Sequence, residues 1–232
     1  MHSIPRQLLI TGTDTEVGKT FISSTLLYKA RQSGATTAAL KPIASGAEET
    51  AEGLRNEDAL ALQRQCTPAL PYAQINPVLL EPAIAPHIAA AESGRRISVS
   101  QLAGLCRGVL IQRRDFTLIE GAGGWRVPLN ERETLADLAR ALNIPVVLVV
   151  GLKLGCINHA CLTAEAILND GLPLVGWVGN ACGPTPMDRL EDNLQTLRQR
   201  LPAPCLGIMP WQSEPDIESA ATQLKWPREL TS

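Results

Sequence analysis

Residues 12–20 hold glycine, lysine and threonine at a spacing suited to binding a polyphosphate. The segment Gly-Thr-Asp-Thr-Glu-Val-Gly-Lys-Thr fits the pattern G-x-x-x-x-G-K-[ST]. In such a loop the backbone N–H groups surround phosphate oxygens. Lys19 would neutralise the outer phosphates, and the hydroxyl of Thr20 would bind Mg²⁺. A glycine-rich turn that merely caps a helix is the alternative. An apolar run precedes the loop and a helical pattern follows it, so we expect it to bind a nucleoside triphosphate.

Two acidic residues could hold or orient the metal ion. Glu120 follows the apolar run 116–119 and precedes four small residues that would let the backbone approach a ligand. A strand-ending glutamate that faces solvent is the alternative. Asp58 lies in the first turn of a predicted helix, where the helix dipole alone would favour an acid. The pattern therefore favours Glu120 and leaves the role of Asp58 open.

A second lysine, Lys41, stands between a predicted strand and Pro42. Proline disfavours helix at the residue before it, so Lys41 should project from a strand end. Ligands of α/β proteins bind in the crevice at such strand ends. A solvated surface lysine is the alternative, but the chain has only five lysines.

Strand-like and helix-like runs alternate along the whole chain. The patterns predict strands at 7–11, 36–40, 115–120, 145–150, 174–180 and 204–209, and helices at 21–32, 56–65, 99–113, 134–142, 156–169 and 187–200. Five prolines make 66–87 a predicted loop with short extended pieces. Continuously apolar strands between helices predict a mostly parallel sheet with helices on both faces. We therefore expect a single α/β domain over 1–232, with a P-loop NTPase-like fold.

Composition limits the partners and the compartment. The 232 residues include 21 basic and 23 acidic ones, and no basic stripe exists to follow a nucleic acid. The longest apolar run, 144–152, contains a proline and is far shorter than the about 20 residues of a membrane-spanning helix. The N-terminus lacks a secretion signal pattern, and the six cysteines form no C-x-x-C pair. We expect a cytoplasmic protein that binds neither nucleic acid nor membrane.

Several sequence blocks, taken together, resemble the dethiobiotin synthetase family. They occur in the family's order and span about residues 7–221. The blocks are the loop 12–20, Lys-Pro-Ile-Ala-Ser-Gly at 41–46, Asn-Glu-Asp-Ala at 56–59, Glu-Gly-Ala-Gly-Gly at 120–124, the segment 150–160 with its Lys-Leu-Gly-Cys-Ile-Asn-His-Ala, and Gly-Trp-Val-Gly-Asn at 176–180.

The resemblance implies an ATP- and Mg²⁺-dependent ring closure in biotin synthesis. The substrates would be 7,8-diaminononanoate, CO₂ and ATP, and the products dethiobiotin, ADP and phosphate. One amine would form a carbamate, ATP would phosphorylate it to a carbamic-phosphoric anhydride, and the second amine would close the cyclic urea. Lys19, Lys41 and Mg²⁺ would offset the repulsion between the carbamate and the γ-phosphate.

The resemblance also implies roles for the remaining site residues. Thr20, Asp58 and Glu120 would ligate or orient Mg²⁺, and Thr15 and Ser45 would contact the diamine or its carbamate. Gly155, Cys156 and Asn158 would receive the substrate carboxylate across the interface of a homodimer. The nucleotide contacts implied are Glu16, Val17, Gly18, Lys19, Thr20, Phe21, Asp58, Glu120, Gly121, Ala122, Gly123, Asn180, Pro210, Trp211, Gln212 and Glu218.

Some alternatives stay open. Asn180 could read the adenine edge or be an ordinary strand-end asparagine, and a single cysteine or histidine such as Cys156 or His159 usually packs rather than reacts. The family often has a tyrosine near 187–200 that helps to hold the carboxylate, and this stretch has none. The rival interpretation is a partner-binding switch ATPase of the partitioning or division-site type. Such loops carry an early second lysine, where this chain has Thr13 and Asp14.

Overall fold

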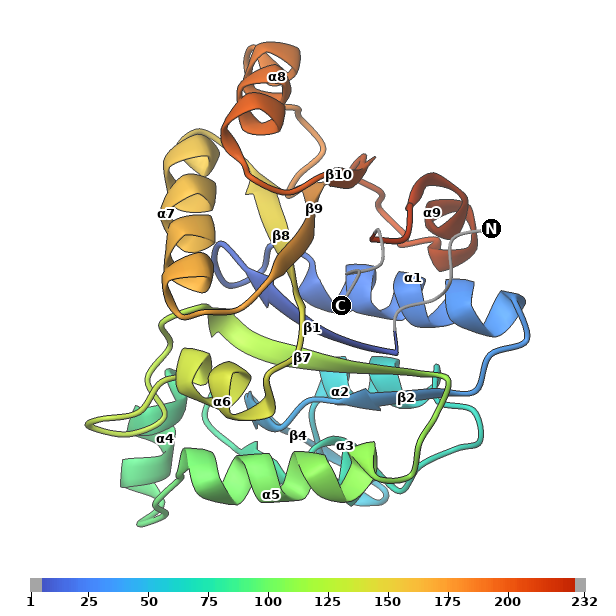
Figure 1. The fold of residues 1–232 in the computed structure, drawn as a ribbon. Helices are drawn as coiled ribbons and strands as arrows, with labels where there is room; N and C mark the ends of the chain where they lie inside the picture. Colours follow the sequence, from blue (N-terminus) through green and yellow to red (C-terminus); the bar gives the residue numbers. More distant parts are fainter. Residues whose placement is uncertain (1–5, 228–232) are drawn as a thin grey trace.

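A six-stranded parallel sheet forms the centre of the molecule, as seen in a computed structural model that describes residues 6–227 (Figure 1). The expectation about a secretion signal at the N-terminus falls partly on residues 1–5, outside the described residues. The strands of the sheet are β1 (Gln7–Gly12), β2 (Thr37–Leu40), β7 (Phe116–Gly124), β8 (Val146–Leu152), β9 (Leu174–Ala181) and β10 (Cys205–Met209).

The sheet order, β10-β9-β8-β1-β7-β2, places β1 between β7 and β8. Every pairing in this sheet is parallel. The chain moves to one side of β1 for its next two strands of the sheet and to the other side for its last three. Such a reversal opens a crevice at the carboxyl ends of the strands, which is where an open α/β sheet binds ligands.

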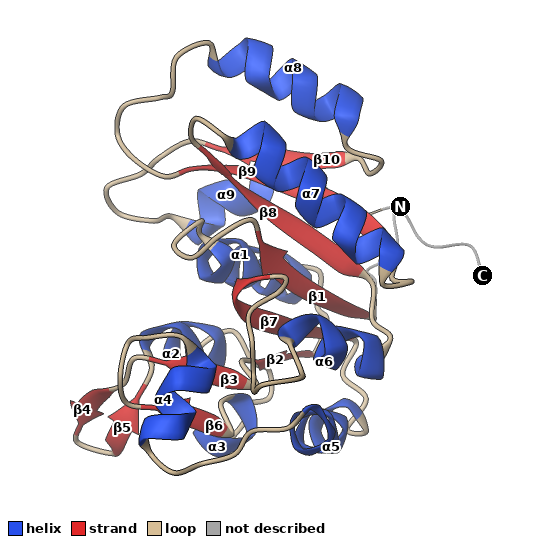
Figure 2. Cartoon of the chain, turned by 90° about the vertical axis from the view of Figure 1, so that its left-hand side faces the viewer, coloured by secondary structure: helices blue, strands red, loops and turns tan. Residues whose placement is uncertain are grey.

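Helices cover both faces of the sheet, as the apolar strands predicted. In Figure 2 the helices α5 (Val99–Leu110), α6 (Leu135–Leu142) and α7 (Cys156–Asn169) lie in front of the sheet, and α1 (Lys19–Gln32) and α9 (Ile217–Gln223) lie behind it. α2 (Glu57–Gln63) packs beside α1, and α8 (Leu190–Arg200) packs beside α7. The α/β fold with a mostly parallel sheet is confirmed.

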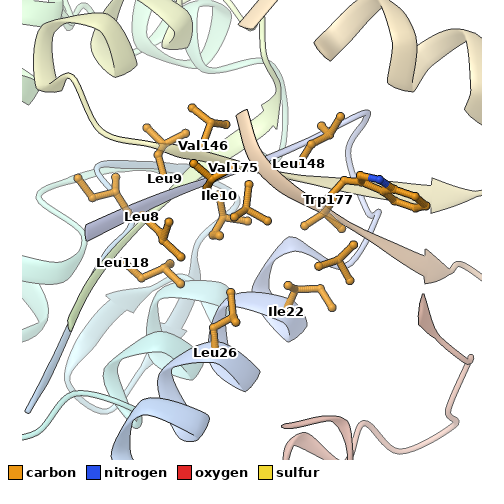
Figure 3. Packing of buried hydrophobic residues seen from close by; sticks show 14 of the residues in the cluster. Leu8, Leu9, Ile10, Ile22, Leu26, Leu118, Val146, Leu148, Val175 and Trp177 are labelled. Atoms are coloured by element: carbon orange, nitrogen blue, oxygen red, sulfur yellow. The ribbon is translucent and has the colours of Figure 1, made fainter. Parts of the chain in front are cut away.

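The core is built from aliphatic side chains on both faces of the central strands. Leu8, Leu9 and Ile10 of β1 are all buried, because helices cover both sides of this strand. Ile22 and Leu26 of α1 point towards the sheet and are fully buried (Figure 3). This packing fixes the start of α1 against the end of β1, and the phosphate-binding loop lies between them.

Five elements of only three or four residues each lie outside the main sheet and its predicted helices. Strands β3 (Ile43–Ser45) and β6 (Val78–Leu80) pair in parallel, and β4 (Glu48–Thr50) and β5 (Gly53–Arg55) form an antiparallel hairpin. α3 is Tyr72–Ile75. None was predicted as a separate element, because three or four residues are too few to show a period.

Two expectations about helices were wrong, and the helix α9 was not predicted. The predicted loop 66–87 also contains the start of α4 (Pro86–Glu92), whose proline occupies the first turn, where no helical N–H is needed. The helix expected from residue 187 begins only at Leu190, because Arg189 adopts a left-handed conformation, with φ 54°. By contrast, α2 begins beside the predicted start at residue 56, because the Asn56 side chain caps the helix by accepting a hydrogen bond from the Ala59 N–H at 3.1 Å.

Within residues 6–227, no helix combines the length and the apolar character needed to cross a bilayer. All six cysteines lie in this part of the chain and are free thiols. Burial raises the pKa of the Cys66 thiol to about 11 and that of Cys106 to about 12. These two thiols therefore remain protonated at neutral pH, as expected of small apolar core residues.

Candidate active site at the carboxyl end of the sheet

The loop after β1 leads directly into α1, as a phosphate-binding loop requires. Gly18 caps α1 with φ 87°, a left-handed conformation that side-chain-bearing residues rarely adopt. The space in which a Cβ of Gly18 would lie is taken by the amide of Asn180, which also donates to the Val17 carbonyl oxygen at 3.1 Å. Glu16 is left-handed as well, with φ 58°. The strand end at Asn180 therefore holds the loop in shape.

Lys19 is buried at the floor of the loop. Its ammonium group donates to the Asp14 carbonyl oxygen at 3.0 Å, and the residue is only 7% exposed. Burial, and secondly the nearby charge of Lys41, lower the pKa of Lys19 to about 8. The side chain is thus mostly charged at neutral pH, and it lacks a carboxylate partner within the described part of the chain. An anion in the loop would supply that partner.

Lys41 joins the two acids that the sequence singled out. Its ammonium group lies 2.6 Å from Oε1 of Glu120 and 3.0 Å from Oδ2 of Asp58. The Thr20 hydroxyl also donates to Oε1 of Glu120, at 2.9 Å. Four residues from four separate elements or loops therefore meet at one point, which the strand-end argument predicted for Lys41 and Glu120.

The charges of this cluster stabilise one another. Burial opposes the charged form of Lys41, but the carboxylates of Glu120 and Asp58 outweigh it and raise the pKa of the lysine. Burial likewise opposes ionisation of Asp58, yet Lys41 outweighs it and lowers the pKa of this carboxyl. Both groups are therefore ionised at neutral pH. One oxygen of Glu120, Oε2, is buried and has no hydrogen-bond partner among the described residues.

A cleft of about 730 Å³ opens beside this cluster. One wall is polar, and the other is made of small apolar side chains such as Ala83 and Val127. The predicted site residues that line the cleft are Thr15, Glu16, Gly18, Lys19, Thr20, Lys41, Ser45, Asp58, Ala122 and Gly123. Ser45 contributes a hydroxyl oxygen that is buried and has no partner among residues 6–227. Glu120 does not line the cleft, because it is fully buried beneath Thr20 and Lys41.

The donor set suits a hard divalent cation. The Thr20 hydroxyl and the Asp58 carboxylate face the cleft, and Glu120 lies behind them with its unpartnered oxygen. Mg²⁺ prefers oxygen ligands and usually binds through one or two carboxylates together with substrate phosphates. Residues 6–227 contain no cluster of three or more His, Cys, Asp or Glu that could hold a metal alone. The donors therefore fit an ion shared with a phosphate.

Three predicted carboxylate-binding residues lie apart from the cleft, at the start of α7. Gly155 caps the helix, Cys156 is buried, and Asn158 is exposed. Burial raises the pKa of the Cys156 thiol, so this residue is not an activated nucleophile. Next to them Lys153 forms an ion pair of 2.9 Å with Asp14 of the phosphate-binding loop.

The other predicted nucleotide contacts also lie outside the lining of the cleft. Val17 is buried, Phe21 is half-buried in the first turn of α1, and Gly121 lies within β7. Asn180 borders the loop through its bond to Val17. The remaining four follow β10 or lie on α9: Pro210, Trp211, Gln212 and Glu218.

Sequence analysis missed several residues of the site. The 83–86 segment lines the cleft, and so do Asn56, Val127 and Pro128. Asn56 is a residue type common at helix N-caps, but a capping role gives no information about a ligand. The other segments have no periodic pattern that would place them in three dimensions.

The sheet order and the loop define the class: a P-loop nucleotide-binding α/β protein. The chain is similar to the septum site-determining protein MinD of Pyrococcus horikoshii complexed with Mg-ADP, with a TM-score of 0.57 and 15% identity, over 93% of this chain and 84% of that one. It is also similar to a ParA family ATPase of Chlorobium tepidum, with a TM-score of 0.54 and 12% identity, over 94% and 89% of the two chains. Such low identities show the fold alone.

Sequence relatives are far more similar. A family model described as an AAA domain matches residues 6–219. The ATP-dependent dethiobiotin synthetase BioD of Pseudomonas paraeruginosa is 60% identical over 215 residues, which are 93% of this chain and 94% of that protein. BioD of Cellvibrio japonicus is 58% identical and BioD 1 of Escherichia coli O157:H7 is 50% identical, each over 94% of this chain and 95% of the relative. The chain belongs to the family of ATP-dependent dethiobiotin synthetases. It is therefore a ligase with a role in biotin synthesis.

Proposed function

We propose that the protein closes the ureido ring of dethiobiotin from 7,8-diaminononanoate, CO₂ and ATP, releasing ADP and phosphate. The relatives that are 50–60% identical over nearly their whole length are named ATP-dependent dethiobiotin synthetases. The observation that supports the proposal most directly is the placement of Lys19 and Lys41 at one cleft beside the phosphate-binding loop. Ring closure needs two anions in contact, and buried cations lower the cost of bringing them together.

The reaction would proceed in three balanced steps. One amine of the substrate adds to CO₂ and loses a proton, which gives a carbamate. A carbamate oxygen then attacks the γ-phosphorus of ATP and ADP leaves, which gives a carbamic-phosphoric anhydride. The second amine attacks the carbonyl carbon, loses its proton and expels phosphate, which completes the cyclic urea.

In this scheme the chain acts mainly by positioning and by charge. Lys19 binds the outer phosphates, and Lys41 faces the carbamate. Thr15 and Ser45 hold the diamine or its carbamate, and the buried Ser45 hydroxyl without a protein partner supports that role. The apolar wall of the cleft suits the hydrocarbon part of the substrate and excludes water. Most of the rate would come from holding the reacting atoms in contact.

Mg²⁺ would be held by Thr20 and Asp58 and oriented by Glu120. When bound, the ion neutralises charge on the phosphate oxygens. The hydroxyl and carboxylate oxygens of these residues are the kind of donor it prefers.

The remaining nucleotide contacts would come from the loop and from the ends of β7, β9 and β10. The backbone of Glu16, Val17, Gly18 and Phe21 would surround the phosphates, and Gly121, Ala122 and Gly123 would let the backbone of β7 approach the nucleotide. Asn180 keeps an amide oxygen for the adenine after its bond to Val17. Pro210, Trp211, Gln212 and Glu218 would complete the base and ribose site.

A homodimer would complete the substrate site. Gly155, Cys156 and Asn158 would bind the substrate carboxylate of the neighbouring subunit through the N-terminus of α7, where free N–H groups favour an anion. We place the enzyme in the cytoplasm, with small-molecule substrates and no nucleic-acid or membrane partner.

The direct test mixes the purified protein with MgATP, bicarbonate and 7,8-diaminononanoate and measures the cyclic urea by mass. We expect dethiobiotin and ADP in equal amounts. ATP hydrolysis without the cyclic urea, stimulated by a protein or by DNA, would instead favour the switch ATPase interpretation.

A further inference from the structure

A chain of hydrogen bonds runs behind the cleft and joins the two segments that carry Asp58 and Lys41. The Tyr72 hydroxyl accepts from the Asn56 N–H at 2.8 Å and donates to Oδ1 of Asn76 at 3.1 Å. The Asn76 amide nitrogen donates to the Lys41 carbonyl oxygen at 2.7 Å. Tyr72 and Asn76, which begin and follow α3, therefore contact the main chain on both sides of the site.

A second hydrogen bond, between backbone groups, also connects this segment to Lys41. The Lys41 N–H donates to the Ile75 carbonyl oxygen at 2.8 Å, so both main-chain polar groups of Lys41 are bound by the 75–76 segment. Asn76 and Lys41 are each 3% exposed, and Asn56 is 9% exposed. Tyr72, which joins them, is half-buried. A polar network is rigid when every member is paired, and removing one partner leaves the buried members unsatisfied.

The other end of the chain fixes the start of α2. Asn56 caps this helix through Oδ1, and its amide nitrogen donates to the Gly46 carbonyl oxygen at 2.8 Å. Asp58 lies two residues further on, in the first turn. Between Lys41 and Asp58 the chain passes through the exposed β4–β5 hairpin, which cannot fix their separation. The helix α2 also packs against β2, which ends next to Lys41. To that packing the Tyr72–Asn76 segment adds a hydrogen-bonded connection between the main chain at Asn56 and the main chain at Lys41.

We propose that Tyr72 and Asn76 are positioning residues of the ligase, which set the separation of the Lys41 ammonium group and the Asp58 carboxylate by holding the main chain of both segments. The inference rests on the proposed roles of Lys41 and Asp58. Neither Tyr72 nor Asn76 lines the cleft, so each acts through the residues that do.

Tyr72→Phe is the variant that tests the proposal. It removes the hydroxyl but keeps the aromatic ring, over which the Arg55 guanidinium lies at 4.5 Å. Thr36→Val is the matched control. Its hydroxyl also accepts a backbone N–H, from Asp115 at 3.0 Å, and donates to a side-chain oxygen, Oδ2 of Asp115 at 2.6 Å. Thr36 precedes β2 at the end of the sheet opposite the cleft.

In steady-state kinetics we expect Tyr72→Phe to lower kcat for dethiobiotin formation by about tenfold or more, because displacements of about 1 Å cost rates of this order. KM for ATP and for the diamine should stay within about twofold, because the groups that contact them remain. Thr36→Val should lower Tm comparably and leave kcat unchanged. A kcat of Tyr72→Phe within twofold of the parent enzyme, or an equal loss in Thr36→Val, would overturn the proposal.

Amide hydrogen exchange gives a second readout that needs no catalysis. In Tyr72→Phe the exchange of both the Asn56 and the Lys41 amides should be at least several-fold faster, although Tyr72 contacts only the former. Faster exchange at Asn56 alone would show that the two segments are independent and would contradict the proposal. Absence of dethiobiotin formation by the unmodified enzyme would refute the proposed function, and the exchange result would still decide whether Tyr72 couples the two segments.

Discussion

The ammonium group of Lys41 lies 2.6 Å from Oε1 of Glu120, and both side chains are almost completely buried. Asp58, at 3.0 Å from the same ammonium group, is the second carboxylate of the cluster. Lys41 thus balances the two carboxylates proposed to hold or orient Mg²⁺. In the proposed reaction, a lysine in this position would be available to an incoming carbamate once a divalent cation shares those carboxylates.

Lys41→Met should therefore make the fold depend on a divalent cation. The variant leaves a buried carboxylate without its counter-charge, which is costly, so its Tm should fall. In saturating ADP, which supplies the phosphate oxygens, adding Mg²⁺ should raise the Tm of the variant by several degrees more than that of the parent enzyme. Arg140→Gln, which removes an exposed charge beside Asp137, is the control and should respond to Mg²⁺ like the parent. Equal Mg²⁺ responses in all three proteins would refute this account of the cluster.

The same Lys41→Met variant should separate chemistry from nucleotide binding. Loss of one cation aimed at developing charge typically costs about 100-fold to 1,000-fold in rate. We expect ring closure to fall by that order, measured as dethiobiotin by mass, while the Kd for MgATP changes by less than about fivefold. Lys19→Met should instead act mainly on binding and weaken the affinity for MgATP strongly. An active Lys41→Met enzyme would contradict the role of this lysine.

Gly18→Ala should distort the phosphate-binding loop. A Cβ there would overlap the Asn180 amide, and the backbone has φ 87°. Gly34→Ala provides a matched control, because Gly34 has φ 84° at the other end of α1 and nothing within 4 Å of its would-be Cβ. Both variants should lose about 1 kcal/mol or somewhat more of stability from the backbone. Only Gly18→Ala should also lose ATP affinity, as measured by calorimetry, and equal affinities in the two variants would refute the steric argument.

The Asp14–Lys153 ion pair should contribute little to stability. Its side chains are 47% and 48% exposed, and water and salt screen such pairs. A double-mutant cycle of Asp14→Asn and Lys153→Met should give a coupling energy below about 1 kcal/mol. The coupling should decrease further in about 0.5 M salt. The Debye length is about 10 Å at 0.1 M ionic strength and becomes shorter as salt is added, so the two charges are screened more strongly. A larger coupling that does not respond to salt would mean that the pair is buried in solution, for instance by a second subunit.

The sequence was sufficient for the main sheet and most of its helices. Strands such as β1 and β8 are continuously apolar because both of their faces are buried, and this pattern is visible without a structure. Short elements were not predictable, since β3 and β6 stabilise each other only by pairing across more than 30 residues. The proline-rich segment looked irregular for the same reason.

The site was predictable where it follows the strand ends. Lys41 directly follows β2, and Glu120 lies within β7, one residue after Ile119. The parallel pairing of these strands, with Leu40 opposite Ile119, brings both side chains to one end of the sheet. The role of Tyr72 was not predictable, because its hydroxyl bonds to Asn56 and Asn76 depend on how an aperiodic segment packs. That Glu120 lies beneath the cleft, and not on its surface, also depends on packing alone.

In the proposed reaction, the carbamate and the γ-phosphate react directly with each other within the cationic cleft. The most direct measurement follows oxygen. The enzyme is mixed with ATP, the diamine and ¹⁸O-labelled CO₂ for a single rapid turnover, and the released phosphate is analysed by mass. If a carbamate oxygen attacks phosphorus and leaves with the phosphate, the product phosphate carries one ¹⁸O atom. Dethiobiotin formed together with unlabelled phosphate would contradict the account.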